Sequence, residues 1–217
     1  MGGELRPEAR IRDLGQATTA IVTSPRERVL AEAFVLFYGT GIRAVGIDLL
    51  IERSGVAKAT FYRHFPSKAQ LVAAYVKRRH DAWMAWLTED VGARGGKGAA
   101  PIVSIFDALA DLFADPDYRG CAVINAVAEV GDSTPEVLEL ARFHKDQVRE
   151  YVAGLATQAR LTRPGHVAEQ VSVLIDGAMV RAQRDHGPAA ATVARGACEK
   201  LLASTGRKRP AAKRASA

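Results

Sequence analysis

Two short amphipathic segments joined by a glycine-containing turn constrain the fold of this chain more than any other feature. The segments cover residues 47–53 and 58–64, and each has the length of about two helical turns. Gly55 follows the first segment and Pro66 follows the second, and both residue types end helices. A longer segment with helical periodicity, residues 25–38, precedes them. Two short helices, a tight turn and a bracing helix predict a helix-turn-helix unit.

The aromatic residues of the second segment indicate which of its faces is buried. Phe61 and Phe65 are four residues apart, so they share one face of a helix and are expected to point inward. We expect a small core formed by Phe34, Phe37, Ile47, Leu50, Val56, Phe61, Phe65 and Leu71. The cationic side chains of the same stretch then lie on other faces. They form either a solvated rim or a surface that contacts a polyanion.

The charge of the chain is unevenly distributed. Residues 24–80 contain ten Lys or Arg against four Asp or Glu, whereas residues 81–205 contain twelve against seventeen. The last twelve residues carry five basic side chains and no acidic one. A basic N-terminal module is therefore joined to an acidic body. This asymmetry indicates a polyanionic partner for the module alone.

The rest of the chain is also predicted to be helical. Residues that favour helix are abundant, and the alternation typical of strands is scarce. Ser67 is expected to cap a long helix over 68–87, followed by a Gly-rich loop over 91–101. Five further helices are expected, at 101–114, 120–130, 135–161, 164–186 and 188–204. The predicted fold class is all-α, with about nine helices in total.

Several classes of protein are disfavoured. No apolar run reaches the roughly 18–20 residues that span a bilayer, and the first 23 residues lack the apolar centre of a secretory signal. Cys121 and Cys198 are too few for a disulfide framework. The chain contains no catalytic or nucleotide-binding motif of the common types, so no catalytic residue, no metal and no cofactor is expected. We expect a cytoplasmic protein that is not an enzyme.

The stretch "GVAKATFYRHFPSKAQL" resembles the signature of the TetR family of bacterial transcriptional regulators, and the resemblance covers residues 24–75. "RGCAVINAVAEV" and "LIDGAMVRAQ" resemble a common subgroup of that family. Gly46 and Ala57 depart from the family pattern by replacing hydroxyl side chains that contact phosphates in relatives. The resemblance implies a three-helix N-terminal helix-turn-helix DNA-binding domain plus a larger α-helical ligand-binding and dimerisation domain. The expected parts are a flexible arm (1–23), the DNA-binding domain (24–70), the ligand-binding and dimerisation domain (71–205) and a disordered basic tail (206–217).

The resemblance also implies which residues contact double-stranded DNA at a palindromic operator. The candidates are Arg43, Lys58, Ala59, Thr60, Tyr62, Arg63, His64 and Lys68. Ala59 and Thr60 are expected to approach base edges. Lys58, Tyr62, His64 and Lys68, with Arg43 as a further candidate, are expected mostly to contact phosphates, which fix position rather than read sequence. For His64 a purely structural hydrogen bond to a neighbouring carbonyl is the alternative.

Relatives enclose a small-molecule cavity in the larger domain, so apolar residues and isolated polar residues of the later helices are candidate ligand contacts. They are Trp83, Trp86, Phe106, Phe113, Asn125, His144, Asp176 and Gln183. The alternatives are that the apolar members are ordinary core and that the polar members satisfy one another. A metal held by His144 and Asp176 and a redox pair of the two cysteines are further alternatives.

The last two predicted helices carry apolar stripes that are either intramolecular core or the interface of a homodimer. The stripes contain Val167, Val171, Leu174, Ile175, Ala178, Val193, Ala197 and Leu201. The resemblance favours a homodimer, because a palindromic operator requires a two-fold symmetric reader. It implies a repressor that an unknown small-molecule effector releases from its operator. The alternative function is a small-molecule-binding or catalytic helical protein whose basic N-terminal module is only structural.

Overall fold

The computed structural model describes residues 24–206, which form nine helices and no β-strand. The predicted arm (1–23) and, apart from Gly206, the predicted basic tail lie outside the described residues. Among the described helices, none has the length and apolarity needed to cross a membrane. The helices are α2 (Pro25–Thr40), α3 (Ile47–Ser54), α4 (Lys58–His64), α5 (Lys68–Arg94), α6 (Ala100–Phe113), α7 (Ala122–Val130), α8 (Pro135–Gln158), α9 (Pro164–Asp185) and α10 (Ala189–Ser204). The all-α prediction is confirmed.

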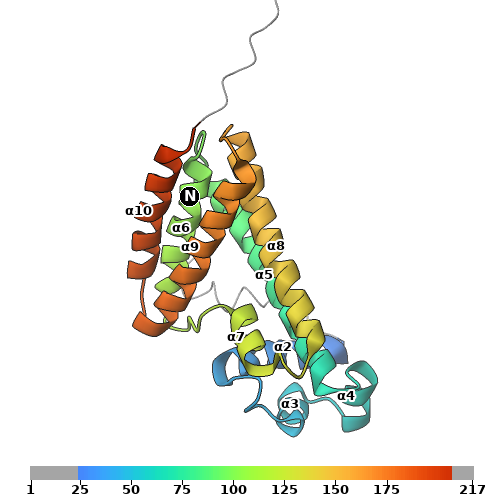
Figure 1. Cartoon of the computed structure of the whole chain (residues 1–217). Coiled ribbons are helices and arrows are strands. Elements are labelled where there is room, and N and C mark those ends of the chain that lie inside the picture. Colours follow the sequence, from blue (N-terminus) through green and yellow to red (C-terminus); the bar gives the residue numbers. More distant parts are fainter. Residues whose placement is uncertain (1–23, 207–217) are drawn as a thin grey trace, which may run out of the picture.

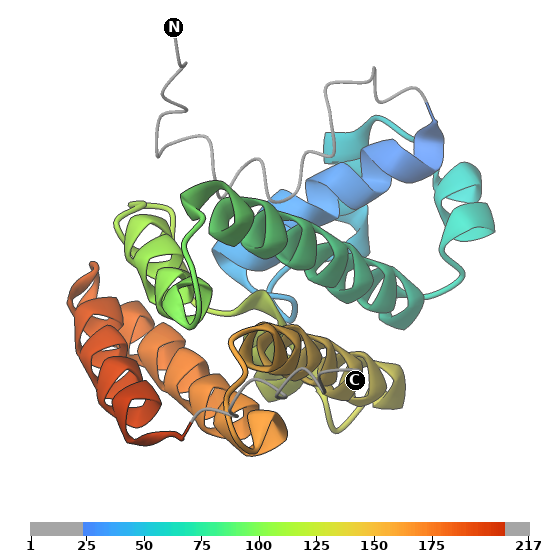
Figure 2. The ribbon, with the colours of Figure 1, turned by 90° about the horizontal axis from the view of Figure 1, so that it is seen from above.

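The helices are arranged in two parts that α5 connects. Helices α2, α3 and α4 form one end of the molecule, and α5 runs from that end alongside α8 into the other part (Figure 1). In that other part α9 packs against both α8 and α10, and α10 packs against α6 (Figure 2). Helix α7 contacts α5 and α8 and lies close to the α2–α4 end. Helices α5 and α7 are therefore placed to transmit a change from one part to the other.

The helix-turn-helix core forms as the sequence predicts. All eight predicted core residues are buried except Ile47, which is partly buried and packs against the others. The rings of Phe61 and Phe65 lie with their centroids 6.2 Å apart. Ile42 and Val45, in the turn between α2 and α3, complete the core and are absent from the predicted set. The i, i+4 aromatic pair is thus the inward face of α4.

Local side-chain chemistry sets the ends of these helices. The Ser24 hydroxyl accepts a hydrogen bond from the Glu27 amide at 3.2 Å, and Ser67 does the same for the Gln70 amide at 3.2 Å. Gly55 ends α3 in the left-handed conformation, with φ 61°. The turn between the two short helices therefore needs a residue at position 55 that tolerates positive φ.

Helix α5 is longer than predicted. The sequence predicts a loop from residue 91, but α5 continues to Arg94, so that prediction is wrong for residues 91–94. Val91 is buried, and the Arg94 guanidinium binds the Asp111 carboxylate of α6 at 2.5 Å. These contacts outweigh the roughly 1 kcal/mol by which a glycine such as Gly92 disfavours a helix interior.

The loop before α7 makes an unusually close approach to α9. The sequence predicts a helix from Gly120, whereas α7 begins at Ala122. Gly120 has φ 87°, and a Cβ added there would lie 2.2 Å from the Gln183 Oε1 atom of α9. Only glycine combines that backbone conformation with that contact. The other helix ends agree with the predicted ones to within three residues.

Candidate functional site

Helix α4 presents an exposed polar face. With Phe61 buried in the core, Lys58, Ala59, Tyr62 and Arg63 remain exposed. The predicted contacts Thr60, His64 and Lys68 are half-buried on the same helix or at the start of α5. All of these candidates therefore lie together at the α2–α4 end of the molecule (Figure 1).

The N-termini of α3 and α4 have free backbone donors. Gly46 and Ala57 occupy the N-cap positions, and within the described residues neither helix start has a side-chain cap. The first N–H groups of a helix then point outward and carry the positive end of the helix dipole. The two departures from the family pattern remove hydroxyls but leave these amides available to a phosphate.

Lys58 and Arg43 each have a partner in the folded chain. The Lys58 ammonium lies 3.6 Å from the Asp48 carboxylate, in an exposed pair that is weak in water. Arg43 is exposed, but its amide donates to the Glu129 side chain at 2.9 Å and its guanidinium Nε donates to the Glu129 carbonyl. Arg43 therefore ties the α2–α3 turn to the end of α7, a link that sequence could not show across 86 residues.

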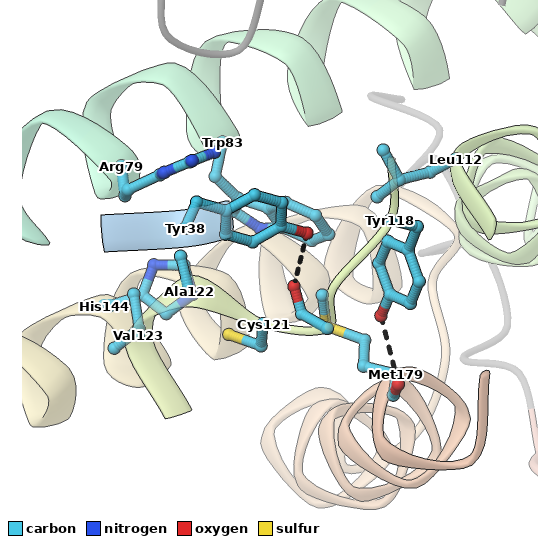
Figure 3. A pocket seen from close by; sticks show the side chains of 11 residues that line it. Tyr38, Arg79, Trp83, Leu112, Tyr118, Cys121, Ala122, Val123, His144 and Met179 are labelled. Atoms are coloured by element: carbon cyan, nitrogen blue, oxygen red, sulfur yellow. Dashed lines mark hydrogen bonds between the residues drawn. The ribbon is translucent and has the colours of Figure 1, made fainter. Parts of the chain in front are cut away.

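A cavity of about 40 Å³ lies where α2, α5, α7, α8 and α9 meet (Figure 3). Its wall includes two of the predicted ligand contacts, Trp83 and His144. The remaining lining residues are Tyr38, Arg79, Leu112, Tyr118, Gly120, Cys121, Ala122, Val123 and Met179. Most of the wall is apolar or aromatic, as is usual for small-molecule sites. Tyr38 belongs to α2, so one wall of the cavity is part of the α2–α4 end.

Two tyrosines at the cavity direct their hydroxyl protons to backbone carbonyls. Tyr38 donates to the Gly120 carbonyl at 3.0 Å and accepts from the Arg119 amide at 2.8 Å. Tyr118 donates to the Met179 carbonyl at 3.0 Å. Burial raises the pKa of Tyr38 to about 12, although the hydrogen bond from Arg119 opposes the shift. Both phenols are neutral at pH 7 and join the loop before α7 to α2 and α9.

His144 is buried and neutral. It is only 3% exposed, and burial lowers its pKa to about 3, with Lys145 and His80 acting in the same direction. The Nδ1 atoms of His144 and His80 lie 3.1 Å apart, so one ring donates and the other accepts. Trp83 and Phe143 contact these two rings edge-on. The histidine pair thus forms a neutral wall beside the cavity.

The other predicted ligand residues lie outside this cavity. Phe106 and Phe113 are buried core, and Trp86 packs against Trp83 at a centroid distance of 4.9 Å. Asn125 and Gln183 line an open groove of about 340 Å³, to which Tyr38 also contributes. The Asp176 carboxylate binds the Lys145 ammonium at 2.5 Å, and within residues 24–206 no group of three or more metal-ligating side chains occurs.

Arg79, the residue that most distinguishes the cavity, is not among the residues predicted from the sequence. In the run "KRRH" it looks like a surface cation. Its partners Phe34 and Tyr38 are more than forty residues earlier, and only the folded α2–α5 packing brings them together. Arg28 was missed for the same reason: its guanidinium donates to the Gly55 carbonyl at 3.4 Å and braces the turn.

The two cysteines are both buried and unpaired with each other. Cys121 lines the cavity, and Cys198 lies in α10. Burial raises the pKa of Cys198 to about 12, with Glu199 adding to the shift. In the described part of the chain, therefore, the alternative of a redox pair has no disulfide to support it.

The apolar stripes of α9 and α10 divide into two faces. Val167, Val171, Ile175 and Ala178 are buried within the chain, so that part of the stripe is intramolecular core. Leu174 and Leu201 are partly buried against the same core. Three valines stay exposed: Val173 (65%), Val180 (53%) and, from the predicted stripes, Val193 (58%). This exposed row, rather than the whole predicted stripe, is available to a second molecule.

Comparisons with known proteins agree with this geometry. The model of bacterial regulatory proteins of the tetR family matches residues 29–75. The HTH-type transcriptional regulator YjdC of Escherichia coli K12 is 24% identical over 159 residues, which are 72% of this chain and 82% of YjdC. The HTH-type transcriptional repressor NemR of the same organism is 27% identical over 135 residues, which are 62% of this chain and 66% of NemR.

A solved structure extends the similarity to the larger part. SCO4454, a TetR-family transcriptional regulator from Streptomyces coelicolor, is 29% identical and has a TM-score of 0.74 over 82% of this chain and 94% of its own. The family match covers α2 to the start of α5, the elements that build the exposed polar face. Residues 29–75 match the tetR family of bacterial regulatory proteins, and the chain is similar over most of its length to TetR-family transcriptional regulators, which supports a DNA-binding regulator.

Proposed function

We propose that this protein is a homodimeric repressor that leaves a palindromic operator when a small molecule occupies the cavity between α2, α5 and α7–α9. The observation that carries the proposal is that Tyr38 and Arg79 join that cavity to the helix-turn-helix. Tyr38 is a residue of α2 and lines the cavity, and Arg79 stacks on α2 from the cavity side. A ligand in the cavity therefore contacts the DNA-binding end directly.

The DNA-binding role belongs to α4 and its neighbours. Lys58, Tyr62 and Arg63 are exposed and are assigned to phosphates, and Ala59 with Thr60 is assigned to base edges. His64 and Lys68 extend the phosphate contacts. Arg43 is assigned an indirect part in DNA binding, because its hydrogen bond to Glu129 fixes the turn that precedes α3.

The dimer is assigned to the exposed row on α9 and α10. Val173 and Val180 are seven residues apart and therefore share one face of α9, with the small residue Gly177 between them. Exposed apolar side chains gathered on adjacent helices are typical of an interface. A two-fold pairing through this face places two copies of α4 for the two half-sites of an operator.

The switch follows from the geometry of α5. Lys68 lies at its DNA end, and Arg79 and Trp83 lie eleven and fifteen residues further along, or roughly 17 and 22 Å at 1.5 Å per residue. A ligand that binds the DNA-incompetent arrangement more tightly shifts the population towards it. In this scheme the ligand weakens DNA binding and so relieves repression. The name of the similar protein NemR, a transcriptional repressor, supports this direction.

Gel-shift titrations with the DNA flanking its own gene, at several salt concentrations, test the proposal. A two-fold symmetric footprint with a steep salt dependence is expected. Compounds that perturb the fluorescence of Trp83 should release the DNA over the same concentration range. Binding of small molecules with no DNA affinity at low salt would favour the alternative, in which the basic module is only structural.

A further inference from the structure

The cavity contains a buried cation without an anionic partner. Arg79 is 7% exposed, and its guanidinium carbon lies 3.4 Å from the ring centre of Phe34 and 4.1 Å from that of Tyr38. Its Nη2 atom donates to the Phe34 carbonyl at 3.1 Å. The ion pairs formed among residues 24–206 do not include Arg79, and its Nε–H has no acceptor there. Arginine stays protonated in proteins, so the charge is present.

The groups around Arg79 are all neutral. Burial lowers the pKa of Arg79, and the neighbouring hydroxyls of Tyr75 and Tyr38 oppose that shift without carrying a charge at pH 7. None of the eleven residues that line the cavity is acidic. His144 is uncharged, as described above. The guanidinium is thus the one charge on the cavity wall formed by the described residues.

The unsatisfied polar atoms at the cavity are donors. The indole Nε1–H of Trp83, like the Nε–H of Arg79, is buried without an acceptor in the described part of the chain. The Tyr38 and Tyr118 hydroxyls have already donated to carbonyls. Buried donors without acceptors are uncommon in native proteins, and each is costly to leave unpaired. Two buried donors at the cavity therefore lack acceptors, and the wall carries no negative charge.

We propose that the effector is a small carboxylate with an apolar body, whose carboxylate oxygens accept from the Arg79 guanidinium and the Trp83 indole. This inference rests on the proposed function, in which the effector occupies this cavity. A planar guanidinium suits a carboxylate because two parallel hydrogen bonds can form. The apolar and aromatic remainder of the wall suits the body of such a molecule, and the cavity of about 40 Å³ has to widen to admit it.

The same contact explains how the ligand would act on DNA binding. Arg79 lies between two rings of α2, and cation–π attraction holds it there. A carboxylate that draws the guanidinium towards the cavity weakens its contact with Phe34 and Tyr38. Helix α2 is thereby released relative to α5, and the orientation of α4 changes with it.

The test compares carboxylates with their neutral amides. Benzoate, phenylacetate, 3-phenylpropanoate and octanoate, each beside its primary amide, are titrated into the full chain and followed by tryptophan fluorescence. At least one carboxylate is expected to bind about tenfold or more tightly than its amide, the size of a charge-assisted hydrogen bond. A panel without any such pair would overturn the proposal.

Variants of Arg79 test whether this residue causes the preference for a carboxylate over its amide. Arg79→Met should bring the carboxylate-to-amide ratio close to one, while Arg184→Met, which removes an exposed guanidinium on α9, should leave it unchanged. If Arg79→Met does not fold, Arg79→Lys is tested in its place. Lysine keeps the positive charge but cannot form two parallel hydrogen bonds to a carboxylate, so the carboxylate-to-amide ratio should fall severalfold. An unchanged ratio in the variant that folds would overturn the proposal.

Different results would refute the carboxylate ligand and the proposed switch. A neutral compound that binds the cavity and releases DNA, in the absence of any carboxylate preference, would refute the carboxylate and leave the proposed function in place. Carboxylates that bind through Arg79 but never affect DNA binding would refute the proposed switch and leave the ligand class in place.

Discussion

The exposed face of α4 and the wall of the cavity both carry positive charge, but they hold it in opposite ways. Lys58 extends into water beside Asp48, where salt screens its interactions beyond a Debye length of about 8 Å. Arg79 is enclosed between two rings, where screening is weak. A partner of the first region gains affinity by contacting many phosphates at once. A partner of the second can be one small molecule with one charge.

The largest effect is expected at the exposed row of α9. Val173→Asp combined with Val180→Asp places charge in a symmetric apolar interface, and an unpaired buried charge costs about 3–5 kcal/mol. Light scattering should find monomers, and operator binding should be lost. Val35→Asp is the matched control, because Val35 is an exposed valine on α2. A folded double variant that remains dimeric would assign the interface to another surface.

The next largest effect concerns the core beneath α4. Phe61 is fully buried, so Phe61→Ala should destabilise the DNA-binding end by about 3–5 kcal/mol. Its neighbour Tyr62 is 40% exposed, and Tyr62→Ala should cost far less stability yet weaken DNA binding. Chemical denaturation and gel shifts measured on both variants separate the two roles. Equal losses of stability would contradict the assignment of inward and outward faces.

A smaller effect is expected from His144. Its pKa of about 3 in the folded chain lies below the ordinary value near 6.5, so the unfolded chain takes up the proton first as the pH falls. The resulting stability is fully present above about pH 6.5 and is lost towards pH 3, by about 2 kcal/mol at pH 5. Burial lowers the pKa of His80 as well, which acts in the same direction.

Unfolding free energies at pH 7 and pH 5 test this expectation. His144→Asn should reduce the loss between the two pH values by about 2 kcal/mol relative to the parent chain. His166→Asn, at an exposed position, should not change it. The same pH dependence in both variants would mean that His144 is charged in the folded state.

The smallest effect is that of a single surface cation. Lys58→Ala should weaken binding to every DNA sequence alike and reduce the slope of log affinity against log salt by about one. Lys77→Ala, on α5 beside Asp81, should leave the slope as it is. A Lys58 variant that alters sequence preference at constant slope would make Lys58 a reader of bases.

The two regions also differ in how far sequence predicts them. The face of α4 follows from spacing within one stretch, because Phe61 and Phe65 fix which side is inward. The cavity depends on contacts between segments far apart, such as Tyr38 with Gly120 and Arg79 with Phe34, which leave no local pattern. Asn125 and Asp176 are candidates because they interrupt apolar helical stretches, and the fold places them with other partners.

The close contact of Gly120 with Gln183 has a consequence for how this sequence can vary. A side chain at position 120 would have to displace Gln183, which then loses its 3.4 Å hydrogen bond to Asn125. A shorter residue at 183 makes room but does not relieve the positive φ at 120. Glycine should therefore be retained at position 120 whatever residue stands at 183. In a library randomised at both positions and selected for regulated expression, glycine should persist at 120 while 183 drifts among small polar residues.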